Sequence, residues 1–154
     1  MIIGVHHTAI SVPDMDAAIA FYNGVLGFEI VSQGSWEKGF VEADRIVGLR
    51  DSVAKSAMLR GANTHIELFE YVEPRGKDQV FDHPMNDHGI THFCLQVTDI
   101  QTEYERLKDA GMTFHCEPQV MGKTAATYGR DPFGNVIEIY EINDPEVAQL
   151  PIEG

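Results

Sequence analysis

Two histidines and two glutamates stand at matching places in this 154-residue sequence, and their side chains are the ones best suited to chemistry. Glu138 follows the turn-forming residues DPFGN and lies within VIEIY, whose β-branched and apolar residues predict a strand. An unpaired carboxylate among apolar neighbours is costly, so a compensating partner for Glu138 is expected. Glu67 lies in a comparable stretch, HIELFEY.

An internal repeat relates these glutamates to two histidines. His7 and His92 are 85 residues apart, and so are Asp14 and Asp99, which each precede a predicted helix. HIELFEY matches VIEIYEI further along each half. Each half therefore predicts a β-α-β-β-β unit with a histidine on its first strand and a glutamate on its last.

The predicted fold class is α+β, with two βαβββ repeats that form a cup-shaped mixed sheet and helices on its outer face. One domain over 1–142 holds the halves 1–72 and 90–142, joined by a connector over 73–89, and the tail over 143–154 is expected to be loosely held. Periodicity and turn residues predict, in chain order, a strand over 1–12, a helix over 15–23, a strand over 28–32, an irregular insert over 33–52 with a short helix at 43–47, strands over 53–59, 65–72 and 90–97, a helix over 100–110, and strands over 113–117, 124–129 and 136–141.

Side-chain alternation predicts that four polar groups project from the sheet face that the helices leave uncovered: His7, Glu67, His92 and Glu138. Two imidazoles and two carboxylates, without a thiolate, suit one divalent ion such as Zn²⁺, Ni²⁺, Co²⁺, Mn²⁺ or Fe²⁺. A metal would also compensate the two carboxylates in their apolar strands. The alternative is a pair of His–Glu contacts, or half-exposed polar residues on strands, with no metal.

The chain resembles the vicinal oxygen chelate superfamily, which includes glyoxalase I, methylmalonyl-CoA epimerase, extradiol ring-cleaving dioxygenases and fosfomycin or bleomycin resistance proteins. The resemblance is carried, across residues 1–142, by HHTAISVPDMDAAIAFYNGVLGFEI, HIELFEY, GITHFCLQV and RDPFGNVIEI. It implies the glyoxalase/bleomycin resistance/dioxygenase fold and one divalent metal ion per site. It also implies a homodimer as the usual assembly, with the ligands drawn from one chain or two. The ligand positions that it implies are His7, Glu67, His92 and Glu138.

The function implied by the resemblance is an isomerase, epimerase or glyoxalase-type lyase. Such an enzyme moves a proton next to a metal-bound carbonyl of a small oxo compound or thioester, through an enediolate or enolate. Glu138 is expected to be a ligand that also acts as the base, with Glu67 as the second catalytic carboxylate. One alternative is an Fe(II) ring-cleaving dioxygenase of the extradiol type. A second alternative is a drug- or metabolite-binding resistance protein without catalysis.

Three further residues are candidates for substrate contact. His65 lies two positions before Glu67, on the same predicted face of the strand. Lys123 and Arg130 flank the strand predicted over 124–129, where they would suit an anionic substrate tail. For His65 the alternative is a polar residue at the rim of the sheet, and for Lys123 and Arg130 it is solvated surface charge.

Composition narrows the classes of partner. A net charge of −13 argues against nucleic acid or an anionic membrane as a partner, because both need a basic surface. The charge names no substrate; the small-molecule substrate is what the resemblance implies. Cys94 and Cys116 do not form a disulfide framework, so a reducing, cytoplasmic location is expected. The sequence has no apolar run of about 18 residues, and no basic region precedes an apolar segment near Met1.

Overall fold

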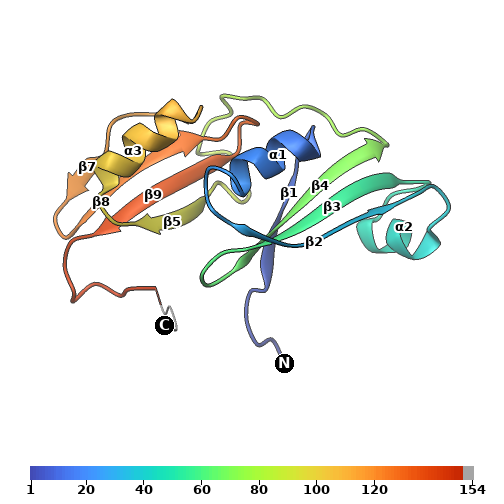
Figure 1. Cartoon of the computed structure of the whole chain (residues 1–154), viewed down its shortest axis with the longest axis horizontal. Helices are drawn as coiled ribbons and strands as arrows, with labels where there is room; N and C mark the ends of the chain where they lie inside the picture. Colours follow the sequence, from blue (N-terminus) through green and yellow to red (C-terminus); the bar gives the residue numbers. More distant parts are fainter. Residues whose placement is uncertain (151–154) are drawn as a thin grey trace. The chain divides into compact units, whose positions relative to one another are not determined.

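The computed structural model describes residues 1–150 and divides into two compact units, Met1–Asp78 and Gln79–Gly154. The boundary between the units falls inside the predicted connector 73–89. Within residues 1–150 the chain forms three helices and two mixed sheets, which confirms the α+β class (Figure 1). None of these helices is long and apolar enough to cross a membrane.

The first unit contains one mixed four-stranded sheet and two helices. Its strands follow the order β1-β4-β3-β2, with β1 parallel to β4 and the other pairs antiparallel. The elements, in chain order, are β1 (His7–Ser11), α1 (Met15–Tyr22), β2 (Glu29–Trp36), α2 (Val41–Val47), β3 (Val53–Arg60) and β4 (His65–Glu73).

The second unit repeats this plan without a counterpart of α2. Its strands follow the order β5-β9-β8-β6, β5 is parallel to β9, and β7 pairs with β8 beyond the end of β6. The elements are β5 (Phe93–Val97), α3 (Ile100–Asp109), β6 (Thr113–Phe114), β7 (Gln119–Met121), β8 (Thr124–Arg130) and β9 (Val136–Ile142).

An aspartate caps the helix that covers one face of each sheet. The Asp14 carboxylate accepts from the Ala17 N–H at 3.0 Å, and Asp99 accepts from the Thr102 N–H at 3.2 Å. The Met15 N–H in the first turn of α1 also donates to Glu70 of β4 at 2.8 Å, which ties this helix to its sheet.

Apolar side chains seal the two helix–sheet contacts. In the first unit α1 packs on β3 and β4, where Leu59, Ile66 and Leu68 are almost fully buried. In the second unit α3 packs on β9, where Ile137 and Ile139 are fully buried. Because side chains alternate along a strand, Glu67 and Glu138 lie on the opposite face, as the sequence predicts.

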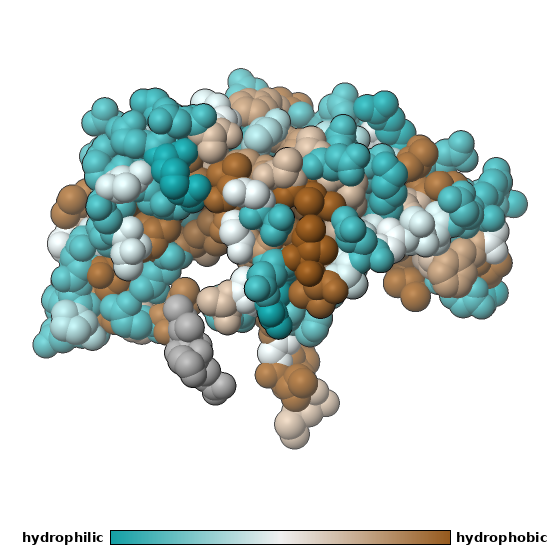
Figure 2. All heavy atoms as spheres, in the orientation of Figure 1, coloured by the Kyte–Doolittle hydropathy of each residue, from teal (hydrophilic) through white to brown (hydrophobic). Residues whose placement is uncertain are grey.

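Three local predictions are wrong. Residues 1–6 are not in a strand, and this stretch projects as an exposed, largely hydrophobic segment at the N-terminus (Figure 2). Residues 33–36 continue β2, because Gly34 and its neighbours pair with β3, so that a glycine expected to interrupt regular structure lies in an edge strand. The sequence predicts no strand over 118–123, yet Val120 and Met121 of β7 pair with Ala125 and Thr124 of β8.

The tail is held more firmly than expected over residues 143–150. The Asn143 N–H donates to the Lys123 carbonyl at 2.8 Å, and the Lys123 ammonium lies 2.9 Å from Asp144 and 2.7 Å from Glu146. These contacts extend the β8–β9 end of the second sheet. The remaining part of the predicted tail, 151–154, lies outside the described residues.

The insert of the first unit is anchored through the single tryptophan. The Trp36 indole N–H donates to the Ser52 hydroxyl at 2.9 Å, and this fully buried hydroxyl donates to Asp44 of α2 at 2.5 Å. Asp44 also accepts from the Ser52 and Asp51 backbone N–H groups, each at 2.8 Å. The hydrogen bonds from Ser52 hold the pKa of Asp44 below its usual value. Ser52 is therefore the junction between α2 and β2.

Replacing Ser52 by alanine is expected to destabilise the protein by about 1–3 kcal/mol, because it removes the partner of the indole and a donor to Asp44. Urea unfolding followed by the fluorescence of Trp36, the only tryptophan, measures the change. Ser35→Ala is the matched control on exposed β2, where surface substitutions alter stability by no more than about 0.5 kcal/mol. Equal unfolding midpoints for the two variants would contradict this account of the insert.

Candidate metal centre

The first unit brings its predicted histidine and glutamate into direct contact. His7 Nε2 lies 3.1 Å from Glu67 Oε2, and their side chains are 36% and 23% exposed. The parallel register of β1 and β4 sets His7 beside His65 and Ala9 beside Glu67. The imidazole of His7 thus reaches forward along the strand to the carboxylate, on the face that α1 does not cover.

The second unit builds the same pair. His92 Nε2 lies 3.2 Å from Glu138 Oε2, with side chains 27% and 15% exposed. His92 directly precedes β5, and Cys94 is beside Glu138 in the parallel register of β5 and β9. Ala9 and Cys94 are therefore equivalent, and the two His–Glu pairs have the same construction.

A buried aspartate fixes the turn that leads into β9. Asp131 is fully buried; its Oδ1 accepts from the Phe133 N–H at 2.9 Å and the Asn135 N–H at 2.8 Å, and its Oδ2 accepts from the Asn135 side chain at 2.8 Å. Gly134 adopts φ +92°, a conformation that disfavours any side chain. The DPFGN stretch thereby determines where β9 begins and which way Glu138 points.

Cys94 and Tyr128 flank Glu138 on the two neighbouring strands. The Cys94 thiol hydrogen-bonds to the Glu138 carboxylate, and desolvation followed by the negative charge of Glu138 raises the pKa of Cys94 to about 12. The thiol therefore stays protonated at neutral pH and is the donor in its hydrogen bond to the carboxylate. A free cysteine is most often a small buried hydrophobe, whereas Cys94 is exposed and lies beside Glu138.

Tyr128 is a site residue that the sequence reasoning missed. It lies directly opposite Glu138 in the antiparallel register of β8 and β9, and its ring centroid is 4.7 Å from that of His92. Desolvation, and then the charge of Glu138, raises the pKa of the Tyr128 phenol. Alternation along TAATYGR would have placed Tyr128 on this face once β8 and β9 were paired in register.

The two pairs fit a divalent cation by their chemistry. Donor atoms 3.1 and 3.2 Å apart can both reach one cation at ordinary ligand lengths of about 2.1 Å, at roughly a right angle. The described residues, 1–150, contain no group of three or more histidine, cysteine, aspartate or glutamate side chains that could hold a metal ion. Each half therefore offers two ligands.

The predicted substrate-contact residues are engaged with other protein groups. The His65 ring stacks on that of His6, with centroids 5.1 Å apart. Lys123 is paired with the two tail carboxylates described above. Arg130 is only 5% exposed and donates to the carbonyl of Gly134 at 3.1 Å and to the carbonyl and Nδ1 of His83. The hydrogen bonds of Arg130 connect His83, in the connector, to the turn between β8 and β9.

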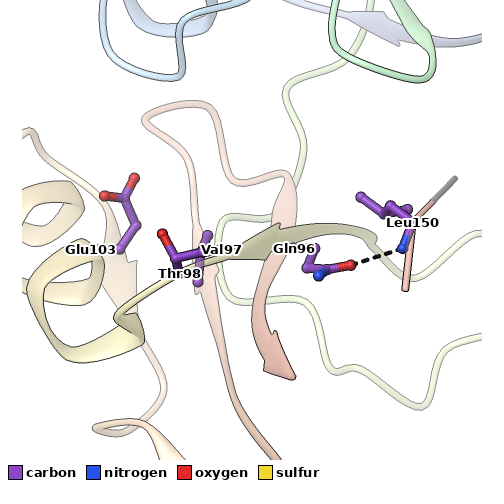
Figure 3. Close-up of a pocket in the computed structure, with 5 residues that line it drawn as sticks. All are labelled: Gln96, Val97, Thr98, Glu103 and Leu150. Carbon is purple, nitrogen blue, oxygen red and sulfur yellow. Dashed lines mark hydrogen bonds between the residues drawn. The ribbon is translucent and has the colours of Figure 1, made fainter. Parts of the chain in front are cut away.

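A recess in the second unit lies at the outer edge of β5. It is lined by Gln96, Val97, Thr98, Glu103 and Leu150, and the Gln96 side chain accepts from the Leu150 N–H at 3.3 Å (Figure 3). The Gln96 amide also donates to the Gln149 side chain at 2.7 Å. The residues that line this recess include neither His92 nor Glu138, so the recess is separate from the His92–Glu138 pair.

Comparisons with known proteins identify the family of the chain. A family model described as the Glyoxalase/Bleomycin resistance protein/Dioxygenase superfamily matches residues 4–139. A 2-epi-5-epi-valiolone epimerase from Actinomyces sp. is 32% identical over 165 residues, which cover 98% of this chain and 84% of the relative. An ethylmalonyl-CoA/methylmalonyl-CoA epimerase from Cereibacter sphaeroides is 32% identical over 111 residues, which cover 72% of this chain and 73% of the relative.

A solved structure of another protein has a similar fold. The crystal structure of a glyoxalase family protein from Bacillus cereus matches with a TM-score of 0.82 and 23% identity, covering 94% of this chain and 97% of the other. At this identity the likeness concerns the fold, because one fold hosts many activities.

Proposed function

The chain belongs to the Glyoxalase/Bleomycin resistance protein/Dioxygenase superfamily, and on this basis we propose that it is a divalent-metal-dependent isomerase or epimerase that moves a proton next to a carbonyl group. The observation that carries the proposal is the equal geometry of the two His–Glu pairs, 3.1 Å in one half and 3.2 Å in the other. We assign both kinds of pair to one cation, with the pairs drawn from one chain or from two. Two histidines and two carboxylates leave about two positions of a six-coordinate ion for oxygens of the substrate.

The proposed chemistry divides between the ion and the protein. A bound divalent ion would polarise the substrate carbonyl and stabilise the negative charge that develops on its oxygen. Glu138 accepts the proton from the carbon beside the carbonyl, and a proton then returns to the opposite face of that carbon in an epimerase, or to the neighbouring carbon in an isomerase. We assign the base to Glu138 because its side chain is 15% exposed, against 23% for Glu67, and because the Cys94 thiol holds it by a hydrogen bond. Glu67 is the second carboxylate available for proton transfer.

The ligand set favours proton transfer over the oxidative alternative. Non-haem iron oxygenases use two histidines and one carboxylate, which leaves three open positions. Here Glu67 makes a contact with His7 that matches the Glu138–His92 contact, and as a second carboxylate ligand it would leave one open position fewer. The resistance-protein alternative, which binds an organic ligand without catalysis, needs no tightly bound ion. Metal content and substrate turnover therefore separate the three classes.

Solvent exchange of a carbon-bound proton tests the proposal. The protein, loaded with Zn²⁺, Ni²⁺, Co²⁺ or Mn²⁺, is incubated in D₂O with 2-epi-5-epi-valiolone or with methylmalonyl-CoA, molecules named for the relatives. Proton NMR should show loss of the signal next to the carbonyl only in samples that contain both protein and metal. Oxygen consumption with a catechol under ferrous iron, without any such exchange, would support the dioxygenase alternative and overturn this proposal.

A further inference from the structure

Each proposed ligand histidine has its second ring nitrogen bound by the residue directly before it. His6 Nδ1 lies 2.8 Å from His7 Nδ1, and Thr91 Oγ1 lies 2.9 Å from His92 Nδ1. His6 and Thr91 are 85 residues apart, so they occupy the same position of the repeat. The two halves thus use two different side chains, an imidazole and a hydroxyl, as the hydrogen-bond partner of the histidine Nδ1 atom.

Each Nδ1 atom needs such a partner because a neutral imidazole carries one N–H donor and one lone-pair acceptor. When His7 Nε2 donates to Glu67, its Nδ1 is an acceptor and needs a donor. When Nε2 offers its lone pair to a cation, the proton lies on Nδ1 and needs an acceptor. A carbonyl or carboxylate partner could serve only the second state. A histidine nitrogen and a threonine hydroxyl can each serve both states.

The ring of His6 is itself held in place. It stacks on His65 with centroids 5.1 Å apart and planes 3° from parallel, and it meets the His7 ring edge-on at 5.1 Å. His65 is in turn the register partner of His7 across β1 and β4. The first half therefore contains a sequence of three imidazoles, in which His65 supports His6 and His6 contacts His7.

Resting on the proposed metal centre, we infer that His6 and Thr91 are positioning residues, which hold the Nδ1 atoms of His7 and His92 so that both Nε2 atoms face the cation. His65 acts through His6. Groups of this kind orient metal-binding imidazoles, and their loss typically weakens metal binding by about 10–100-fold.

Zinc affinity, measured by competition with a chromophoric chelator, tests the inference without any substrate. His6→Ala and Thr91→Val should each raise the dissociation constant by about 10–100-fold. His6→Asn and Thr91→Ser should restore most of the affinity, because their side chains can both donate and accept. His88→Ala and Thr113→Val, which alter exposed residues of the connector and β6, are the matched controls and should leave the constant unchanged.

A second readout reports the hydrogen bonds themselves. In the zinc-loaded wild type, ¹⁵N NMR should show protonated Nδ1 atoms on His7 and His92 whose N–H protons exchange slowly with water. Exchange should become fast at His7 in His6→Ala and at His92 in Thr91→Val. Circular dichroism melting of each variant, close to that of the wild type, verifies that the fold is retained.

The outcomes distinguish this inference from the function on which it rests. A wild-type protein that takes up no divalent ion overturns both. A wild-type protein that binds zinc, together with variants that bind it equally well, overturns only the positioning roles. A loss of affinity that persists in His6→Asn and Thr91→Ser also overturns them, because packing and not hydrogen bonding would then explain the loss.

Discussion

Glu138→Gln is expected to lower kcat/KM by about 10²–10⁴-fold, which is the usual contribution of a general base. The amide keeps an oxygen that can face the ion but cannot accept the substrate proton, so metal content should stay near that of the wild type. The rate is measured by the D₂O exchange assay on the substrate that responds to the wild type, with the metal content of each sample determined in parallel.

Two further variants serve as a comparison and a control for Glu138→Gln. Glu67→Gln makes the same change in the equivalent pair of the other half, and a smaller loss of turnover is expected because Glu138 is assigned as the base. Glu105→Gln neutralises an exposed carboxylate on α3 and should leave turnover unchanged. Wild-type turnover by a fully loaded Glu138→Gln protein would remove Glu138 as the base, without affecting its role as a ligand.

His7→Ala and His92→Ala are expected to abolish tight metal binding, each by removing one of the two imidazoles. In the wild type, a free ion concentration of about 100 times the dissociation constant should raise the free energy of unfolding by about 2.7 kcal/mol. The same concentration should give no measurable increase in either variant. Urea unfolding with and without the ion measures the difference, and a chelator should reverse the effect in the wild type.

His115→Ala provides the control for that experiment. His115 is an exposed histidine of the second unit whose backbone N–H donates to the Tyr128 carbonyl, a contact that alanine retains. It should respond to the ion as the wild type does. Equal stabilisation of all four proteins by the ion would mean that the ion binds elsewhere, and the ligand assignment to His7 and His92 would be lost.

The repeat made the two pairs visible in the sequence. A single histidine on a strand carries little information, but His7 and His92 recur in phase with Glu67 and Glu138. Alternation then placed each glutamate on the face opposite the helix, and the buried isoleucines of β9 confirm that placement. Patterns with a period of two are strong where one face of a strand is sealed, because a shift by one residue would bury the charge.

The repeat and the strand alternation do not predict the contacts of single side chains. Arg130 sits beside a strand like a free surface cation, yet it is buried against the carbonyls of Gly134 and His83. His6 directly precedes β1, and its ring nitrogen lies within hydrogen-bond distance of the His7 ring. Both contacts depend on side-chain rotamers and on the path of a connector, which hydrophobic periodicity does not encode.

Strand β7 and the end of β2 were missed for a related reason. Gly34 and Gly122 favour turns when they are read locally, but Gly34 pairs within an edge strand and Gly122 (φ +66°) forms the tight turn between β7 and β8. Long-range pairing supplies the free energy that makes these short stretches extended. Strand existence at a sheet edge is therefore the part of the fold that local sequence describes least well.

The central claim is that the His7–Glu67 and His92–Glu138 pairs bind one divalent ion together, and X-ray absorption spectroscopy of the zinc- or cobalt-loaded protein tests it most directly. The account predicts one ion per chain with two imidazole nitrogens and carboxylate oxygens around it at about 2.0–2.2 Å, and no sulfur. A spectrum with sulfur from Cys94 or Cys116 at about 2.3 Å, or with no imidazole, would contradict it.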